Sequence, residues 1–257
     1  MSNNIVAQFN NIQKFPSPWT PSFITTTALW LDASDANTIT ESGGTVSQWD
    51  DKSGNGNDVS QDTEIKQPAT GSNTIGGLNV LLFDGSNDIM TNSSFAMSTA
   101  NMSVFLVRRQ VSETGSRTWN IGKNTDEQGA IREGSNGSGT RFYGYRWPEN
   151  QGVSLTGDLL SHVTCYVKTG TALQEAYIDG TLEGNNTATL TTFTSEQMSI
   201  GAFGSIEANV EFAEMVVVSS ALSTADHQKM EGYLAWKWGL VANLPSDHPY
   251  KDAAPTV

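Results

Sequence analysis

The stretch Leu78–Thr91, LNVLLFDGSNDIMT, decides how the rest of the chain is interpreted. Its first half is rich in strand-forming residues, and the run VLLF is typical of a central strand covered on both faces. Asp84-Gly85 supplies turn chemistry, because glycine tolerates a positive φ and aspartate can bond its own backbone two residues on. No helix of useful length fits between Gly77 and Gly85. The stretch therefore predicts a strand, a tight turn and a second strand within a β-sandwich.

Composition supports the same class of fold. The chain has 257 residues, enough for one large all-β domain or two small domains, with 24 glycines and only 16% charged residues. Such a composition suits many short strands joined by turns. The net charge of −13 argues against binding to a nucleic-acid backbone or adsorption to an anionic membrane. It is compatible with solubility, cation binding or a basic protein partner. The single cysteine, Cys165, rules out an internal disulfide framework and is expected to be buried.

The N-terminal residues predict a separate segment. They lack a basic region followed by an apolar one, so we expect no secretory signal, and no apolar run is long enough for a transmembrane helix. The chain would then be made in a cytoplasm and, if it works outside the cell, would leave by lysis or as part of a particle. Ile5, Phe9 and Ile12 form a short helical stripe, and three prolines at 16, 18 and 21 favour an extended connection. We predict an arm over residues 1–25 that folds back on the sandwich or docks on another chain.

Strand patterns and one helix fill the remainder. The expected strands cover residues 28–33, 46–50, 102–108, 118–121, 129–132, 141–147, 162–168, 173–178, 198–202 and 210–218. A helix over 223–239 follows, with Ser223 as its N-cap and Gly239 as its stop. We predict one domain over 26–242, an extended tail over 243–257, and no internal repeat.

Several segments together resemble laminin-G-like, concanavalin A-like jelly-roll domains. They are LWLDASD (29–35), WDDKSGNGND (49–58), FDGSND (83–88), AYIDGTLEG (176–184) and FAEMVVVSSALSTADHQKMEGYLAWKWGL (212–240), and the resemblance covers about residues 26–250. It implies an antiparallel two-sheet sandwich closed by a C-terminal helix. Domains with this ending look similar to proteins of bacteriophages and aquatic bacteria, where phage members are carried on virion surfaces and tails. A fold does not by itself fix an activity.

Enzymatic chemistry finds little support in the sequence. Glycosidases of this fold need paired acids on one strand face, and the alternation of a regular strand would place Glu211 and Glu214 on opposite faces. No G-x-S-x-G elbow is present, and the three histidines have no placed partners. We expect His162 to open a strand, His227 to lie on the helix surface and His248 to lie in the tail.

Two kinds of binding site are candidates. Calcium sites in related folds use Asp and Asn oxygens in rim loops, and the candidates here are Asp50, Asp51, Asn55, Asp58, Asp84 and Asp88. Ordinary Asx turns are the alternative. Sugar binding needs aromatic faces beside planar polar groups. The carbohydrate candidates are Arg141, Tyr143, Tyr145 and Trp147, which share one strand face by alternation, with Trp119 and Asn120 nearby. Coverage of the core is the alternative for this stripe. We expect Trp30, Trp49, Trp236 and Trp238 in the core or against the helix.

Three functions therefore stay open. The first is a non-enzymatic virion surface protein, a capsid decoration or tail component anchored to other virion proteins through residues 1–22 and displaying its rim loops to host glycans. The second is a soluble carbohydrate-binding module, and the third is a divergent glycoside hydrolase. Neither nucleic acid nor membrane insertion is expected, and self-association into a homo-oligomer stays open.

Overall fold

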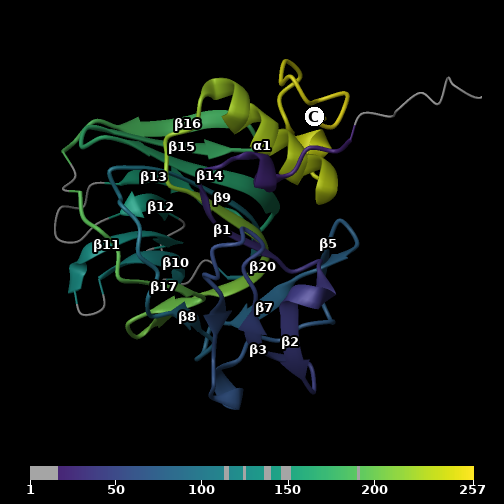
Figure 1. Ribbon diagram of the computed structural model, residues 1–257, viewed down its shortest axis with the longest axis vertical. Coiled ribbons are helices and arrows are strands. Elements are labelled where there is room, and N and C mark those ends of the chain that lie inside the picture. Colours follow the sequence, from purple (N-terminus) through teal and green to yellow (C-terminus); the bar gives the residue numbers. More distant parts are fainter. Residues whose placement is uncertain (1–16, 113–115, 124–125, 136–139, 146–151, 190–191) are drawn as a thin grey trace, which may run out of the picture.

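The computed structural model describes residues 17–112, 116–123, 126–135, 140–145, 152–189 and 192–257. These residues form two antiparallel sheets packed face to face, and a single α-helix with the C-terminal segment covers the outside of one sheet (Figure 1). The predicted all-β sandwich with one C-terminal helix is confirmed.

Within the described residues, one sheet has seven strands and the other has nine. The seven-stranded sheet runs β1-β20-β9-β14-β15-β16, with β7 also beside β20. Its strands are β1 (Thr27–Asp32), β7 (Leu81–Asp84), β9 (Asn101–Gln110), β14 (Ser161–Thr169), β15 (Leu173–Ile178), β16 (Thr181–Asn186) and β20 (Asn209–Val218). The nine-stranded sheet runs β13-β12-β11-β10-β17-β8-β4-β3-β2. Its strands are β2 (Ile39–Ser42), β3 (Thr45–Trp49), β4 (Val59–Ser60), β8 (Met90–Asn92), β10 (Ser116–Lys123), β11 (Asp126–Ser135), β12 (Thr140–Tyr145), β13 (Val153–Thr156) and β17 (Gln197–Ile200). Two small hairpins pair β5 (Thr74–Ile75) with β6 (Leu78–Asn79) and β18 (Ala202–Phe203) with β19 (Ile206–Glu207).

The central strands of the seven-stranded sheet, β9, β14 and β20, are buried on both faces. The inner face of the sheet packs against the nine-stranded sheet through a core that includes Trp49, Phe83 and Phe212. Its outer face packs under the helix through a second core that includes Phe105 and Trp238. A strand with two buried faces needs apolar residues at successive positions. Double burial therefore explains the unbroken apolar runs in β9, β14 and β20, including Cys165, whose predicted burial is confirmed.

The stretch Leu78–Thr91 forms the predicted strand, turn and strand, but its two longer strands do not pair with each other. Strand β7 pairs with β20 in one sheet, and β8 pairs with β17 and β4 in the other, so the turn carries the chain between the sheets. Leu81 and Phe83 are buried, whereas Leu82 is half-buried and Asp84 exposed. The expectation of a strand covered on both faces therefore holds only in part for residues 80–83, because Val80, Leu81 and Phe83 are buried but Leu82 is half-buried.

The helix α1 (Thr224–Lys237) begins as predicted. The Ser223 side chain accepts a hydrogen bond from the backbone N–H of Asp226 and donates one to its carboxylate. Gly239 has a φ of +71°, which suits the residue just after a helix end. Short 3-10 turns lie at Pro21–Phe23, Ala36–Thr38, Glu64–Lys66 and Val241–Asn243. Among the described residues no helix has the length and apolar character needed to cross a bilayer.

Both ends of the described chain pack on α1. Trp19 is buried against Tyr233, and its backbone N–H donates to the carbonyl of Pro255. Tyr250 lies against Gly232, where an added Cβ would come within 2.5 Å of the Tyr250 Cβ. The segment after residue 242, expected as an extended tail, is thus part of the packed structure. Residues 1–16 of the expected arm lie outside the described residues.

A buried charge network fastens α1 to the seven-stranded sheet. The Lys237 ammonium lies 2.7 Å from an Asp32 carboxylate oxygen and 2.6 Å from one of Glu214. Burial raises the pKa of the Glu214 carboxyl, although Lys237 opposes the shift. Burial also raises the pKa of Asp32, but Lys237 and Lys52 outweigh this effect and hold that pKa below its usual value. Glu214 also accepts hydrogen bonds from the Trp30 and Trp238 indoles and the Tyr233 hydroxyl.

The three charged residues of this network come from sequence segments that carry the family resemblance. Asp32 comes from LWLD, Glu214 from FAEM, and Lys237 from YLAWKWGL. Trp30, Trp49 and Trp238 are buried as expected. Trp236 is 40% exposed and donates from its indole nitrogen to the Tyr250 carbonyl, so its assignment to the core was wrong, because it lies on the solvent side of α1.

Candidate functional site

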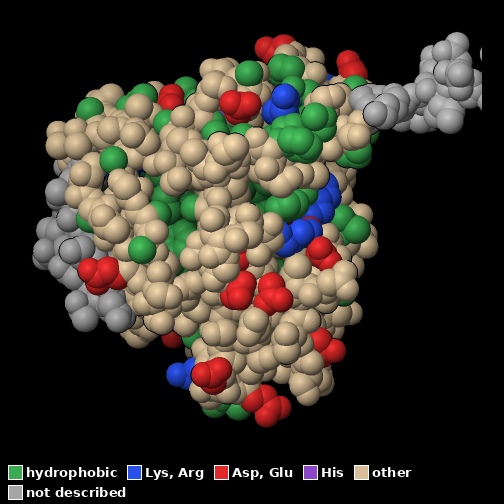
Figure 2. Space-filling view, viewed as in Figure 1, with side chains coloured by type: hydrophobic (Ala, Val, Ile, Leu, Met, Phe, Trp, Pro, Cys, Tyr) green, Lys and Arg blue, Asp and Glu red, His purple; other side chains and the backbone are tan. Residues whose placement is uncertain are grey.

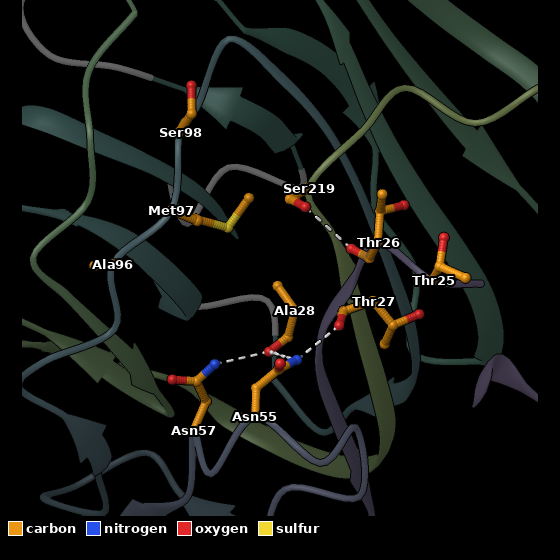
Figure 3. A pocket seen from close by; sticks show the side chains of 10 residues that line it. All are labelled: Thr25, Thr26, Thr27, Ala28, Asn55, Asn57, Ala96, Met97, Ser98 and Ser219. Carbon is orange, nitrogen blue, oxygen red and sulfur yellow. Dashed lines mark hydrogen bonds between the residues drawn. The ribbon is translucent and has the colours of Figure 1, made fainter. Parts of the chain in front are cut away.

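A polar groove of about 500 Å³ opens beside the edge strand β1, and Figure 3 shows it from close by. Residues 96–98 form one side, and residues 25–28 with Ser219 form the other (Figure 3). Asn55 and Asn57 close one end (Figure 3). The volume lies within the range of roughly 300–1,000 Å³ that is usual for small-molecule sites.

The loop between β3 and β4 builds this end of the groove by covering the edge of β1. The Asn55 amide donates to the Thr27 carbonyl at 2.8 Å, and the Asn57 amide donates to the Ala28 carbonyl at 2.8 Å. Asp51 accepts the Trp30 backbone N–H at 2.9 Å. An open strand edge exposes unpaired backbone groups. Side chains of the loop satisfy these groups here, and this is the structural reason for its Asn- and Asp-rich sequence.

Seven of the ten residues that line the groove carry a hydroxyl or an amide, and none of the ten has an ionisable side chain. The lining consists of Thr25, Thr26, Thr27, Ala28, Asn55, Asn57, Ala96, Met97, Ser98 and Ser219. Hydroxyls both donate and accept hydrogen bonds, as do amides, and this is the pairing that sugar hydroxyls require. General acid or base catalysis needs a titratable group placed at the reacting atoms. The groove can therefore bind a polyhydroxylated molecule, and its lining offers no group for breaking a bond.

The surface around the sandwich is acidic overall. The chain carries a net charge of −13. On the face shown in Figure 2, acidic side chains are spread widely, whereas the basic side chains gather mainly at one side. An anionic ligand approaching this protein would meet an unfavourable long-range potential.

The first group of calcium candidates serves the loop itself. Asp51 accepts backbone N–H groups of Ser53 and Trp30, and Asp58 accepts that of Asp51. Asp50 accepts from the Gln48 amide. Asn55, predicted as an oxygen ligand, lies instead at the polar groove. The contact between Asp51 and the Ser53 N–H is that of an Asx turn, the alternative interpretation of these residues. The other contacts hold the loop together and tie it to β1.

The second group of calcium candidates also forms a turn. The Asp88 carboxylate accepts the backbone N–H of Asp84 at 2.9 Å, and burial raises the pKa of Asp88 to about 6. Across the described ranges, no three carboxylate, imidazole or thiol groups converge in a way that could hold a metal ion. A calcium site in either loop stays a prediction.

The carbohydrate candidates fall into two sets. Arg141, Tyr143 and Tyr145 lie in β12, where only the backbone is described, and Trp147 lies outside the described residues. Trp119 and Asn120 are 1% and 0% exposed. The Trp119 indole donates to Glu133 inside the sandwich at 3.0 Å. A ring buried in this way cannot stack on a sugar that arrives from solvent, and neither residue lines the polar groove.

The expectation that Glu211 and Glu214 lie on opposite faces was wrong. Glu211 pairs with Arg109 and Glu214 with Val107, so Ala213 is an extra residue in the ladder. A bulge of this kind reverses the alternation beyond it. Both acids consequently lie on the outer face. Each carboxylate is buried and forms its own ion pair, Glu211 with Arg109 and Glu214 with Lys237. They form no open pair of carboxylates.

The histidines are more enclosed than predicted. His227 is buried, not on the helix surface, and its ring contacts Phe105 and Tyr177. His227 and His248 both bond the buried Glu231 carboxylate, at 2.9 and 3.4 Å. His162 lies near the start of β14 as expected. Helical periodicity could not reveal this cluster, because His248 comes from the C-terminal segment and docks only in the folded state.

No family model and no curated protein matches the chain. Solved structures do match its fold. The botulinum neurotoxin serotype D ligand-binding domain, solved with N-acetylneuraminic acid, is 15% identical at a TM-score of 0.55, covering 80% of this chain and 50% of that one. A structure of botulinum neurotoxin type C, described as entering cells through two ganglioside molecules, is 13% identical at a TM-score of 0.58, with 84% and 53% covered. Trypanosoma rangeli sialidase with sialic acid is 10% identical at a TM-score of 0.59, with 87% and 36% covered.

These likenesses show that the fold is a lectin-like β-sandwich. The chain spans about half or less of the length of these structures, and identities of 10–15% show the fold alone. The expected kinship with laminin-G-like and phage proteins finds no matching family model and stays a prediction.

Proposed function

We propose that this chain is a non-enzymatic carbohydrate-binding β-sandwich whose polar groove beside β1 receives the sugar. The observation that carries the proposal is the groove itself, which is lined by hydroxyl and amide side chains and by no ionisable one. The lectin-like fold, which it shares with a toxin domain solved in complex with a sugar, supports the same class of ligand.

The test is glycan-array binding by the full chain, with two matched variants. Ala96→Trp places a large side chain at the groove, whereas Ala253→Trp places the same side chain at an exposed alanine outside it. We expect the wild type and Ala253→Trp to bind the same glycans and Ala96→Trp to lose them. Binding by Ala96→Trp at wild-type strength would remove the groove from the proposal, and no binding by any form would reject a lectin role.

The second part of the proposal is the setting on a virion, and its support is the sequence resemblance alone. Residues 1–16 would provide the attachment to other virion proteins, since Trp19 and Pro21 are already buried against the domain. Removing residues 1–16 should leave an intact glycan-binding domain that no longer copurifies with particles. Normal incorporation of the shortened chain would contradict the attachment.

A further inference from the structure

A second hollow adjoins the polar groove. It has a volume of about 290 Å³ and is lined by Phe23, Ile24, Thr25, Thr26, Ser220, Ala221, Leu222, Ser223 and Asp226. Thr25 and Thr26 line both hollows. Between the two hollows, Ser219 and Ser220, which follow β20, contact Thr26. The Ser219 hydroxyl donates to the Thr26 carbonyl, and the hydroxyls of Thr26 and Ser220 lie 2.9 Å apart.

Phe23 stands at this second hollow with its ring open to solvent. Its side chain is 52% exposed. The 3-10 turn Pro21–Phe23 fixes its backbone, since the Phe23 N–H donates to the Thr20 carbonyl and Pro21 is buried. Among the described tryptophans and phenylalanines, Trp236 is the other exposed one, and its indole N–H is bonded to the Tyr250 carbonyl. An exposed ring on a backbone held by this turn, beside hydroxyl groups, suits the apolar face of a pyranose.

The charges of the two hollows select among sugars. Asp226 is the ionisable residue in the second lining, and the first lining has none. The Ser223 hydroxyl donates to one Asp226 oxygen, and the other can accept from sugar hydroxyls. No lysine or arginine is present in either lining to receive a carboxylate or sulfate group, and the net charge of −13 opposes such a ligand.

We propose that the two hollows form one extended site for an uncharged linear oligosaccharide, with one end of the glycan in the polar groove and a further pyranose stacked on Phe23. The inference rests on the proposed carbohydrate-binding function and adds to it the length and charge of the ligand. It sets this chain apart from its structural neighbours solved with sialic acid, because that sugar carries a carboxylate.

The experiment is calorimetric titration of the full chain with neutral glucan, mannan and galactan oligosaccharides, from disaccharides to hexasaccharides, and with sialylated and sulfated counterparts. We expect affinity for one neutral series to rise with length. Phe23→Ala should weaken binding of the longer members about two- to tenfold, the value of one aromatic contact, and leave the disaccharide unchanged. Phe23→Tyr should retain the rise with length.

Ile65→Ala is the matched control, because Ile65 is 74% exposed and lines neither hollow. It should bind every glycan as the wild type does. Equal affinity for short and long glycans, an unchanged length dependence in Phe23→Ala, or a preference for the anionic series would each overturn this inference and leave the groove as a sugar site. Failure to bind any carbohydrate would instead reject the proposed function itself.

Discussion

Replacing Lys237 by methionine tests the network that holds α1 on the sheet. Methionine preserves an unbranched apolar stem near Trp238, whose ring centroid lies 5.3 Å from the lysine nitrogen. It removes the cation that contacts Asp32 and Glu214 at 2.7 and 2.6 Å. Asp32 would keep Lys52 at 2.8 Å. Glu214, with a fully buried side chain, would keep only neutral hydrogen-bond donors.

The expected loss follows from this asymmetry. Removing one partner of a buried ion pair costs about 3–5 kcal/mol, because the remaining charge stays buried without compensation. We expect the lower end of that range, about 3 kcal/mol, since three hydrogen bonds still reach Glu214 and Lys52 still serves Asp32.

Acidification should reduce the loss. Burial already raises the pKa of Glu214, and losing Lys237 raises it further. A carboxyl with a folded-state pKa above its unfolded value binds more protons when folded, so its unfavourable contribution disappears as the pH falls through that pKa. The deficit of Lys237→Met should therefore shrink as the pH falls from neutral toward the ordinary glutamate pKa of about 4.3.

Urea unfolding of Lys237→Met across this pH range is the assay. Lys229→Met is the matched control on the same helix, and it should cost less than about 0.5 kcal/mol because Lys229 makes no ion pair with a described residue. In a Glu214→Gln background, the cost of Lys237→Met should fall by about 1–3 kcal/mol, the usual coupling of contacting residues. Equal stability of the two methionine variants, or a deficit that grows on acidification, would refute the reasoning.

Three other perturbations follow from single contacts. Gly232→Ala should destabilise the protein and expose the C-terminal segment to limited proteolysis, although alanine favours an isolated helix by about 1 kcal/mol, because the new methyl would meet Tyr250; a gain in stability would contradict this. Burial lowers the pKa of His162, but hydrogen bonds to Asp179 and a second aspartate raise it overall. The charged His162 therefore stabilises the fold fully below about pH 6.5, and this stabilisation is lost as the pH rises through the folded-state pKa. Denaturation of His162→Gln at several pH values should lack that loss, and an unchanged profile would argue against it. Burial raises the pKa of Asp88 to about 6, so wild-type stability should rise as the pH falls through that value, and Asp88→Asn should remove this rise in the same assay; persistence of the rise would assign it to another group.

Local sequence patterns predicted the elements well where each element depends on its own residues. Strands β14 and β15 form where strands were predicted and pair as a hairpin, and β15 has the predicted limits, Leu173–Ile178. The cap at Ser223 also forms as predicted. Alternation failed at Ala213, because a bulge depends on the pairing of β20 with β9, which strand periodicity does not encode.

The polar groove could be predicted only in part. Asn55 was predicted as an oxygen ligand for calcium, whereas in the structure it lines the polar groove. The Thr25–Thr27 run and residues 96–98 carry no motif that marks a site. They become neighbours only when β1 and the segment before β9 reach the same edge of the sandwich.

Local patterns were sufficient for the class of fold and the terminal helix, because alternation, turn residues and capping act over a few positions. Tertiary structure decided which strands share a sheet, where Glu214 and His248 find their partners, and which polar side chains line a common groove. These outcomes depend on contacts between residues distant in the chain, and such contacts exist only after the two sheets and α1 have packed together.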